Sequence, residues 1–346
     1  MQRLLRGRMF YLVLTGFVLG LGAYGRTVHL QPWLAAPTAD RKPPPSAEAR
    51  WTEDVDPLGL RTAAADDPAL RRFLFVLVFL TSGMLCAGVV LAMWSLLTGR
   101  IRRLWRGPFH PPLPWTFGEV VRITLMMFLV MPLLQFARVA LVLLRPDWPM
   151  DPNLWINVSM LALYVLMLAT ILVFAAGKSR PPLGAVGLST AGWREAIRVG
   201  VQGYVALFPW LLLTLWGVVQ VAQRFHLEPP LQPLHRMILA EERTVVLALT
   251  VFLACLIGPM AEEVFFRGVL FAALRNRVSR WSAMVVSGAL FSAVHLNVVG
   301  FIPMWLLGCL LADLYERTGS LLSPIAIHVL HNTLLVGLAL TYRWAM

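Results

Sequence analysis

Long apolar runs separated by short polar segments follow one another along most of the chain. The runs occupy residues 9–24, 73–99, 116–144, 154–177, 202–223, 244–275, 281–297, 301–317 and 321–342. A helix needs about 20 apolar residues to cross the hydrocarbon layer of a bilayer. The pattern therefore predicts an all-α fold, a polytopic transmembrane helix bundle with eight or nine spans.

The pattern also predicts three regions along the chain. Residues 1–72 hold the first apolar run and a polar stretch, which we interpret as an N-terminal anchor helix and an external loop. A signal peptide is the alternative for the first run, but no small-x-small cleavage site follows it, so we favour an uncleaved anchor. Residues 73–243 are transmembrane helices of unassigned role, and residues 244–342 are the region where polar groups interrupt the apolar runs.

Composition supports a membrane protein and changes how the charge is interpreted. The 346 residues are 58% hydrophobic and only 14% charged, with a mean hydropathy of +0.69, which excludes a soluble globule. The formal net charge of +12 comes without a recognisable nucleic-acid motif, so we expect no nucleic-acid partner. The three cysteines lie in apolar runs without CxxC spacing and indicate no disulfide framework.

Basic residues fall on alternate loops and so predict an orientation. The N-terminus and the segments 100–106, 178–198 and 275–280 are rich in Lys and Arg, as cytoplasmic loops of membrane proteins are. We expect an integral, multi-pass protein of the plasma (inner) membrane with a cytoplasmic N-terminus, and an external C-terminus if all nine spans are real.

Several ionisable and polar residues lie where the bilayer disfavours them, and such positions mark functional sites by default. They are Glu262, Glu263, Arg267, His295, His328 and Asn332. On a helix, Glu263 and Arg267 are i and i+4, within reach of an ion pair, and His328 and Asn332 share a face by the same spacing. Counting residues from the basic turn near 278 places Glu262 and His295 at a similar height on antiparallel neighbours.

Other polar residues have plainer interpretations. We expect His331 to hydrogen-bond a neighbouring helix or support the site indirectly. Glu241 and Glu242 precede an apolar run and stand next to Arg243, so we expect a solvated helix start. Glu316, followed by a basic residue, is interpreted as interfacial.

The residue types allow two kinds of chemistry. A buried carboxylate is a base suited to activating water, while imidazole and the Asn332 amide donate hydrogen bonds to a growing oxyanion. A zinc site uses the same types, with Glu262, His295 and His328 as three ligands and water as the fourth. Both lead to peptide-bond hydrolysis within the membrane, and the residues alone leave the choice open.

Three short motifs carry a family resemblance. Glu262-Glu263-Val264-Phe265-Phe266-Arg267 resembles the EExxxR motif of the CAAX-protease and bacteriocin-processing (CPBP) family, also called Abi or Rce1-like intramembrane proteases. Phe291 to His295 resembles its FxxxH motif, and His328 to Asn332 its HxxxN motif. Their order and separation also match, over about 244–342.

The resemblance implies an all-helical membrane endopeptidase whose catalytic helix core is 244–342. It implies that Glu262 activates water together with His295, that His328 and Asn332 form an oxyanion hole, and that Glu263 and Arg267 support them. We favour this mechanism without a cofactor over the zinc-dependent one. The expected partner is a membrane-associated peptide or protein substrate in the lipid bilayer. The alternatives are a transporter or proton relay and a non-catalytic scaffold.

Overall fold

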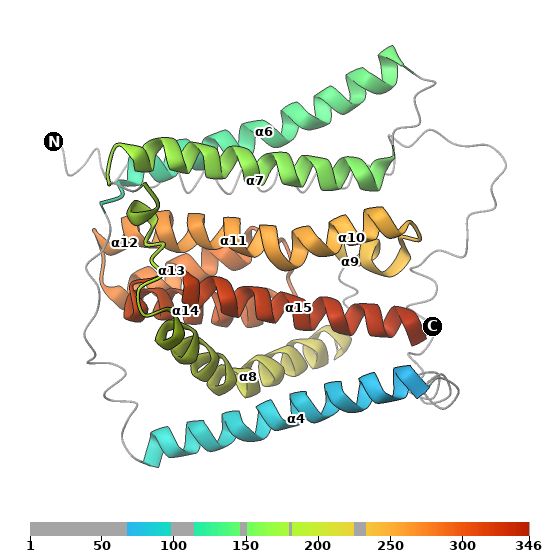
Figure 1. Cartoon of the computed structure of the whole chain (residues 1–346), viewed down its shortest axis with the longest axis vertical. Coiled ribbons are helices and arrows are strands. Elements are labelled where there is room, and N and C mark those ends of the chain that lie inside the picture. Colours follow the sequence, from blue (N-terminus) through green and yellow to red (C-terminus); the bar gives the residue numbers. More distant parts are fainter. Residues whose placement is uncertain (1–67, 98–113, 146–150, 180–181, 225–232, 346) are drawn as a thin grey trace. The chain divides into compact units, whose positions relative to one another are not determined.

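The computed structural model describes residues 68–97, 114–145, 151–179, 182–224 and 233–345, and within these ranges it contains helices and no strands (Figure 1). The helices are α4 (Pro68–Leu97), α6 (Phe117–Leu144), α7 (Pro152–Ala176), the 3-10 helix η1 (Pro182–Val186), α8 (Trp193–Arg224), α9 (Pro233–Ala240), α13 (Arg280–Ala293), α14 (Phe301–Thr318) and α15 (Leu322–Ala345). The segment between α9 and α13 is one continuous helix, Thr244–Arg275. The predicted all-α class is confirmed.

The predicted number of spans is not confirmed. Five of the described helices are long and apolar enough to cross a membrane: α6, α7, α8, the helix Thr244–Arg275, and α15. The run predicted at 281–297 forms only the 14 residues of α13, about 21 Å at 1.5 Å per residue, which is short of the roughly 30 Å hydrocarbon layer. The predicted anchor helix, and all of the external loop before residue 68, lie outside the described residues.

Contacts divide the chain into two units. One consists of residues 1–56 and 294–296, of which only the turn 294–296 is described. The other consists of residues 57–293 and 297–346 and includes every described helix. The contacts reported below lie within this second unit.

Two glycines let α13 and α14 approach each other closely. A Cβ atom on Gly308 would lie 2.8 Å from the Cα atom of Gly288, and one on Gly288 would lie 2.9 Å from the backbone nitrogen of Cys309. Hydrophobic burial drives the association of helices only weakly in lipid. Small residues at such crossings let the two backbones approach, so that close packing holds the helices together. The close contact brings the Gly308 carbonyl near side chains of the helix Thr244–Arg275.

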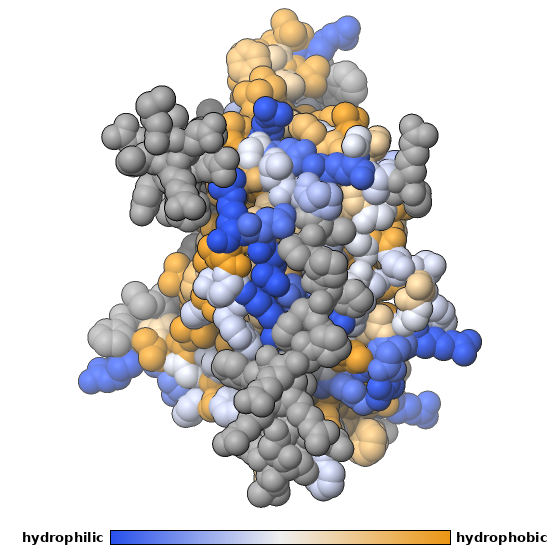
Figure 2. Space-filling view, turned by 90° about the vertical axis from the view of Figure 1, so that its left-hand side faces the viewer, coloured by the Kyte–Doolittle hydropathy of each residue, from blue (hydrophilic) through white to orange (hydrophobic). Residues whose placement is uncertain are grey.

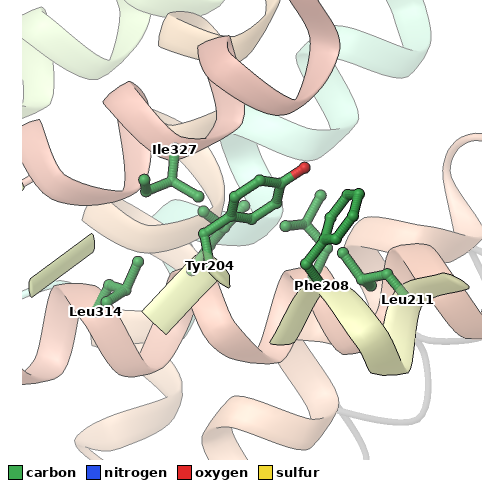
Figure 3. Close-up of a cluster of buried hydrophobic side chains, with 7 residues drawn as sticks. Tyr204, Phe208, Leu211, Leu314 and Ile327 are labelled. Carbon is green, nitrogen blue, oxygen red and sulfur yellow. The ribbon is translucent and has the colours of Figure 1, made fainter. Parts of the chain in front are cut away.

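A cluster of buried apolar side chains joins α8, α14 and α15 (Figure 3). It consists of Tyr204, Phe208, Leu211, Leu307, Leu311, Leu314 and Ile327. α8 also packs closely on α4. The packing is possible because Gly88 has no Cβ, which would clash with the Val205 carbonyl. The cluster therefore fixes α15, which bears the HxxxN motif, against α14.

Ion pairs join the helix ends near the turn between α12 (Ala272–Arg275) and α13. Arg275 pairs with Glu316 at 2.9 Å, while Arg280 and Arg317 both pair with Asp313. Glu316 is buried, and its partner Arg275 comes from another helix instead of being the adjacent Arg317; its interfacial depth stays a prediction. Figure 2 looks at this end of the helices and shows hydrophilic side chains gathered between hydrophobic ones.

A second polar cluster lies between the start of α7 and the start of the helix Thr244–Arg275. Glu241 accepts hydrogen bonds from Arg243 at 2.7 Å and from Asn153 at 2.7 Å, and Arg243 also pairs with Asp151. The prediction of a solvated helix start was therefore wrong for Glu241, which is buried, although the neighbouring Glu242 is exposed.

Replacing Gly308 by Ala should lower the free energy of unfolding by about 1–3 kcal/mol, since the added methyl group meets backbone that cannot move aside. Gly337→Ala is the matched control, because nothing lies within 4 Å of a Cβ there and Ala favours a helix over Gly. Thermal unfolding in detergent measures both. Equal midpoints for the two variants would contradict the packing described.

Acid should weaken the cluster around Glu241. Hydrogen bonds from Arg243, then from Asn153, lower the pKa of Glu241 from 4.5 to about 2. A lowered pKa in the folded state adds stability that is complete above pH 4.5 and is lost as the pH falls toward 2. The unfolding midpoint should therefore fall less steeply with acid in Glu241→Gln than in the unaltered chain. Glu242→Gln should keep the original pH dependence, and a parallel response of all three proteins would show that this pKa is not lowered.

Candidate functional site

The helix Thr244–Arg275 widens into π-helical turns on both sides of the two glutamates. The π turns are η2 (Leu253–Ile257) and η3 (Val264–Phe271), and between them α11 (Gly258–Glu263) ends with Glu262 and Glu263. In η2 the Gly258 N–H donates to the Leu253 carbonyl. π turns of this kind occur frequently at functional sites.

Pro259 explains why a carbonyl of this helix accepts a bond from another helix. The Gly258 N–H, the usual α-helical donor to Ala254, is taken by Leu253, and Pro259 has no N–H for a π-helical bond to Ala254. Asn332 on α15 supplies the donor, since its Nδ2 lies 2.9 Å from the Ala254 oxygen. The HxxxN motif is thereby fixed against the helix that bears the glutamates.

Glu263 and Arg267 form a fully buried ion pair. Arg267 Nη1 donates to Glu263 Oε1 at 2.7 Å, and neither side chain has any exposed surface. Arg267 Nη2 donates to the Gly308 carbonyl at 3.2 Å, and the guanidinium carbon lies 4.6 Å from the centre of the Phe291 ring. The i, i+4 spacing seen in the sequence thus brings the two residues together, and α13 and α14 close around them.

His328 lies between the two glutamates. Its Nδ1 is 2.8 Å from Glu263 Oε1, and its Nε2 is 3.9 Å from Glu262 Oε2. The edge-to-face contact with Phe291, with ring centres 5.4 Å apart, limits rotation of the imidazole. Arg267 stays protonated in proteins and a carboxylate only accepts, so we assign the Nδ1 proton to His328 as the donor to Glu263.

Glu262 is the more accessible carboxylate of the two. Its side chain keeps 20% of its surface exposed, whereas that of Glu263 is sealed. Tyr164 on α7 donates from its hydroxyl to Glu262 Oε1 at 3.1 Å. The sequence reasoning missed Tyr164; the available signal was a phenol in the middle of the apolar run 154–177.

His295 and His331 have different surroundings. His295 is half-buried in the turn that follows α13, and its convergence with Glu262 stays a prediction. His331 contacts the neighbouring helix α8, with Nδ1 2.8 Å from the Tyr204 hydroxyl. This is the helix-to-helix hydrogen bond expected for His331.

The described residues do not fit a metal centre. No group of three or more His, Cys, Asp or Glu side chains within the described ranges is arranged to hold a metal ion. Glu262 Oε2 and His328 Nε2 face each other at 3.9 Å, which is a pair of side chains and not a set of three. We therefore derive no step through zinc.

Comparison with known proteins supports the motif assignment. Residues 244–334 match the family model described as "Type II CAAX prenyl endopeptidase Rce1-like". This segment is Rce1-like. The resemblance predicted from the three motifs is confirmed, and the Rce1-like segment contains all of the predicted site residues.

Curated relatives from bacteria match only part of the chain. Bacillus subtilis (strain 168) "Putative membrane peptidase YdiL" is 31% identical over 25% of this chain and 36% of its own length. Staphylococcus aureus (strain USA300) "Membrane-embedded CAAX protease MroQ" is 33% identical over 28% of this chain and 42% of its own length. The chain thus covers less than half of these two relatives, and no solved structure matches it.

Removing one charge of the buried pair should lower the free energy of unfolding. Arg267→Met leaves Glu263 charged and buried, which should cost about 3–5 kcal/mol of unfolding free energy. The double variant Glu263→Gln/Arg267→Met has no buried charge and should recover part of that loss. Thermal unfolding in detergent measures both variants.

The matched control for this prediction is Arg198→Met. Arg198 pairs with Glu195 on the exposed side of α8, where 59% and 61% of the two side chains are accessible, and exposed pairs contribute little. The unfolding midpoint should hardly change. Equal losses in Arg267→Met and Arg198→Met would contradict a structural role for the buried pair.

Proposed function

We propose that the chain is an intramembrane endopeptidase that hydrolyses a peptide bond in a membrane-associated protein or peptide. The observation that carries the proposal is the position of His328 within 4 Å of both Glu262 and Glu263, inside a segment that matches an Rce1-like family model. These side chains belong to helices long and apolar enough to span a bilayer. Water can reach the Glu262 carboxylate, and the buried pair of Glu263 and Arg267 lies beside it. This arrangement suits the activation of water for hydrolysis.

Glu262 is the base in this mechanism. Its carboxylate takes a proton from water, which then attacks the scissile carbonyl carbon, and His295 assists by holding that water. The partial exposure of Glu262 supports this role, since water and substrate must reach the base. The proton is passed on to the leaving amine as the carbon–nitrogen bond breaks.

His328 and Asn332 stabilise the oxyanion. In its imidazolium form His328 carries a proton on each ring nitrogen. It donates through Nδ1 to Glu263 and keeps its Nε2–H for the substrate oxygen. The Asn332 amide has two N–H groups, one of which is held by Ala254, and the other serves the same oxygen. Fixed donors of this kind need no reorientation when charge develops on the oxygen.

The names of the relatives and the membrane setting support a class of substrate. The matched family is described as a CAAX prenyl endopeptidase, so lipidated C-terminal peptides are the first candidates. In the proposed topology the eight or nine spans lie in the plasma membrane with the N-terminus in the cytoplasm, where the basic loops 100–106, 178–198 and 275–280 also lie. A substrate anchored in the same bilayer reaches Glu262 without leaving the membrane.

Cleavage of fluorogenic lipidated peptides by the purified chain in detergent tests the proposal. Glu262→Gln and His295→Ala should each lower kcat/KM by at least about 100-fold, because each removes part of the proton transfer to and from water. Asn332→Ala should lower kcat by about 100- to 1,000-fold through loss of an oxyanion donor. Circular dichroism checks that the helix content is unchanged.

Glu242→Gln is the matched control, because it makes the same change at an exposed position and should leave cleavage intact. Measuring bound metal and repeating the assay with a chelator distinguishes the mechanism without a cofactor from the zinc-dependent mechanism. Cleavage that survives both Glu262→Gln and His295→Ala would reject the proposal, and activity that is lost with the chelator and restored by zinc would replace it with the zinc-dependent version.

A further inference from the structure

Tyr164 contacts the proposed base directly from another helix. Its hydroxyl lies 3.1 Å from Glu262 Oε1, and only 9% of the residue is exposed. The other carboxylate oxygen, Oε2, faces His328 Nε2 at 3.9 Å. The two oxygens of Glu262 thus have different neighbours, and one of them is held by a hydrogen-bond donor.

Gly258 provides the space that this contact needs. Gly258 and Glu262 are i and i+4 on α11, so they share a face of the helix. A Cβ atom on Gly258 would lie 3.1 Å from the Tyr164 hydroxyl oxygen and 2.9 Å from the Leu253 carbonyl oxygen. Any larger residue here would displace either the phenol or the backbone of η2.

Two further polar contacts fix the position of α7 relative to its neighbours. Asn153 donates to Glu241 at 2.7 Å, and Asn157 Nδ2 donates to Thr250 at 2.9 Å. Asn153, Asn157 and Tyr164 are spaced by four and seven residues, so they lie on one face of α7. Tyr164 is the last of these contacts along the helix and the one that meets the candidate site.

We propose that Tyr164 is a positioning residue for Glu262, which deepens the proposed peptidase function and rests on it. The phenol donates to Oε1 and fixes the rotation of the carboxylate, so that Oε2 is the oxygen that takes the proton from water next to His328. A base held in one orientation is productive more of the time, and displacement by about 1 Å costs up to about 100-fold in rate. Tyr164 acts through Glu262 and takes no proton from the substrate.

Steady-state cleavage by Tyr164→Phe in the full chain tests the inference. This variant removes one oxygen atom and should lower kcat about 10- to 100-fold while KM changes little, because substrate contacts are unaltered. Tyr204→Phe is the matched control: it removes a buried hydroxyl that is bonded to His331 rather than to Glu262, and kcat should stay within about twofold. Figure 3 shows Tyr204 in its apolar cluster.

Two more variants separate positioning from simple stability. Asn157→Ala breaks a contact on the same face of α7 and should lower the unfolding temperature while leaving kcat unchanged. Gly258→Ala keeps the phenol but crowds it and should reproduce the loss of kcat, whereas Gly217→Ala, with no neighbour within 4 Å, should not.

The outcomes distinguish this inference from the proposed function. If Glu262→Gln is inactive but Tyr164→Phe has the kcat of Tyr204→Phe, the positioning role is wrong and the peptidase function stands. If Asn157→Ala lowers kcat as much as Tyr164→Phe does, the effect belongs to α7 packing and the inference is overturned. If Glu262→Gln is itself active, both proposals fail.

Discussion

The sealed ion pair between Glu263 and Arg267 is the constraint on which the rest of the site depends. Two charges removed from water are tolerated only where each finds well-placed partners. Glu263 Oε1 therefore accepts from both Arg267 and His328, and Arg267 reaches the Gly308 carbonyl and the ring of Phe291. These contacts draw α13, α14 and α15 around one point of the helix Thr244–Arg275. The close approach of Gly288 and Gly308 makes the geometry sterically feasible.

Two adjacent glutamates have opposite surroundings because neighbouring residues on a helix point about 100° apart. Glu263 faces the interior, where it orients His328, and Glu262 faces a partly open side, where Tyr164 and His328 flank its two oxygens. Glu263 is sealed among buried side chains, whereas part of Glu262 is accessible to water. This division between an orienting acid and a reacting one is the physical basis of the proposed hydrolysis.

Periodicity and motif spacing predicted the helices and most of the polar cluster, since i, i+4 geometry is a property of any helix. They did not predict the turns η2 and η3, because a π turn leaves the apolar pattern unbroken. At η2, the Ala254 carbonyl that Pro259 leaves without a helical donor is bonded by Asn332 from another helix. Burial of Glu241 and Glu316 was missed because their partners Asn153 and Arg275 come from other helices. The number of spans is not confirmed, because an apolar run records composition and does not fix the length of a helix: α13 stops at Ala293.

Nitrogen NMR of the full chain with ¹⁵N-labelled histidine tests whether the buried ion pair orients His328, with His328→Gln identifying the signals of His328. We expect a proton on Nδ1 of His328, and a shift of that signal in Glu263→Gln, because the Glu263 carboxylate held by Arg267 accepts the bond from Nδ1. A bare Nδ1 whose signal does not respond to Glu263→Gln would contradict it, since the buried pair would then not orient the imidazole.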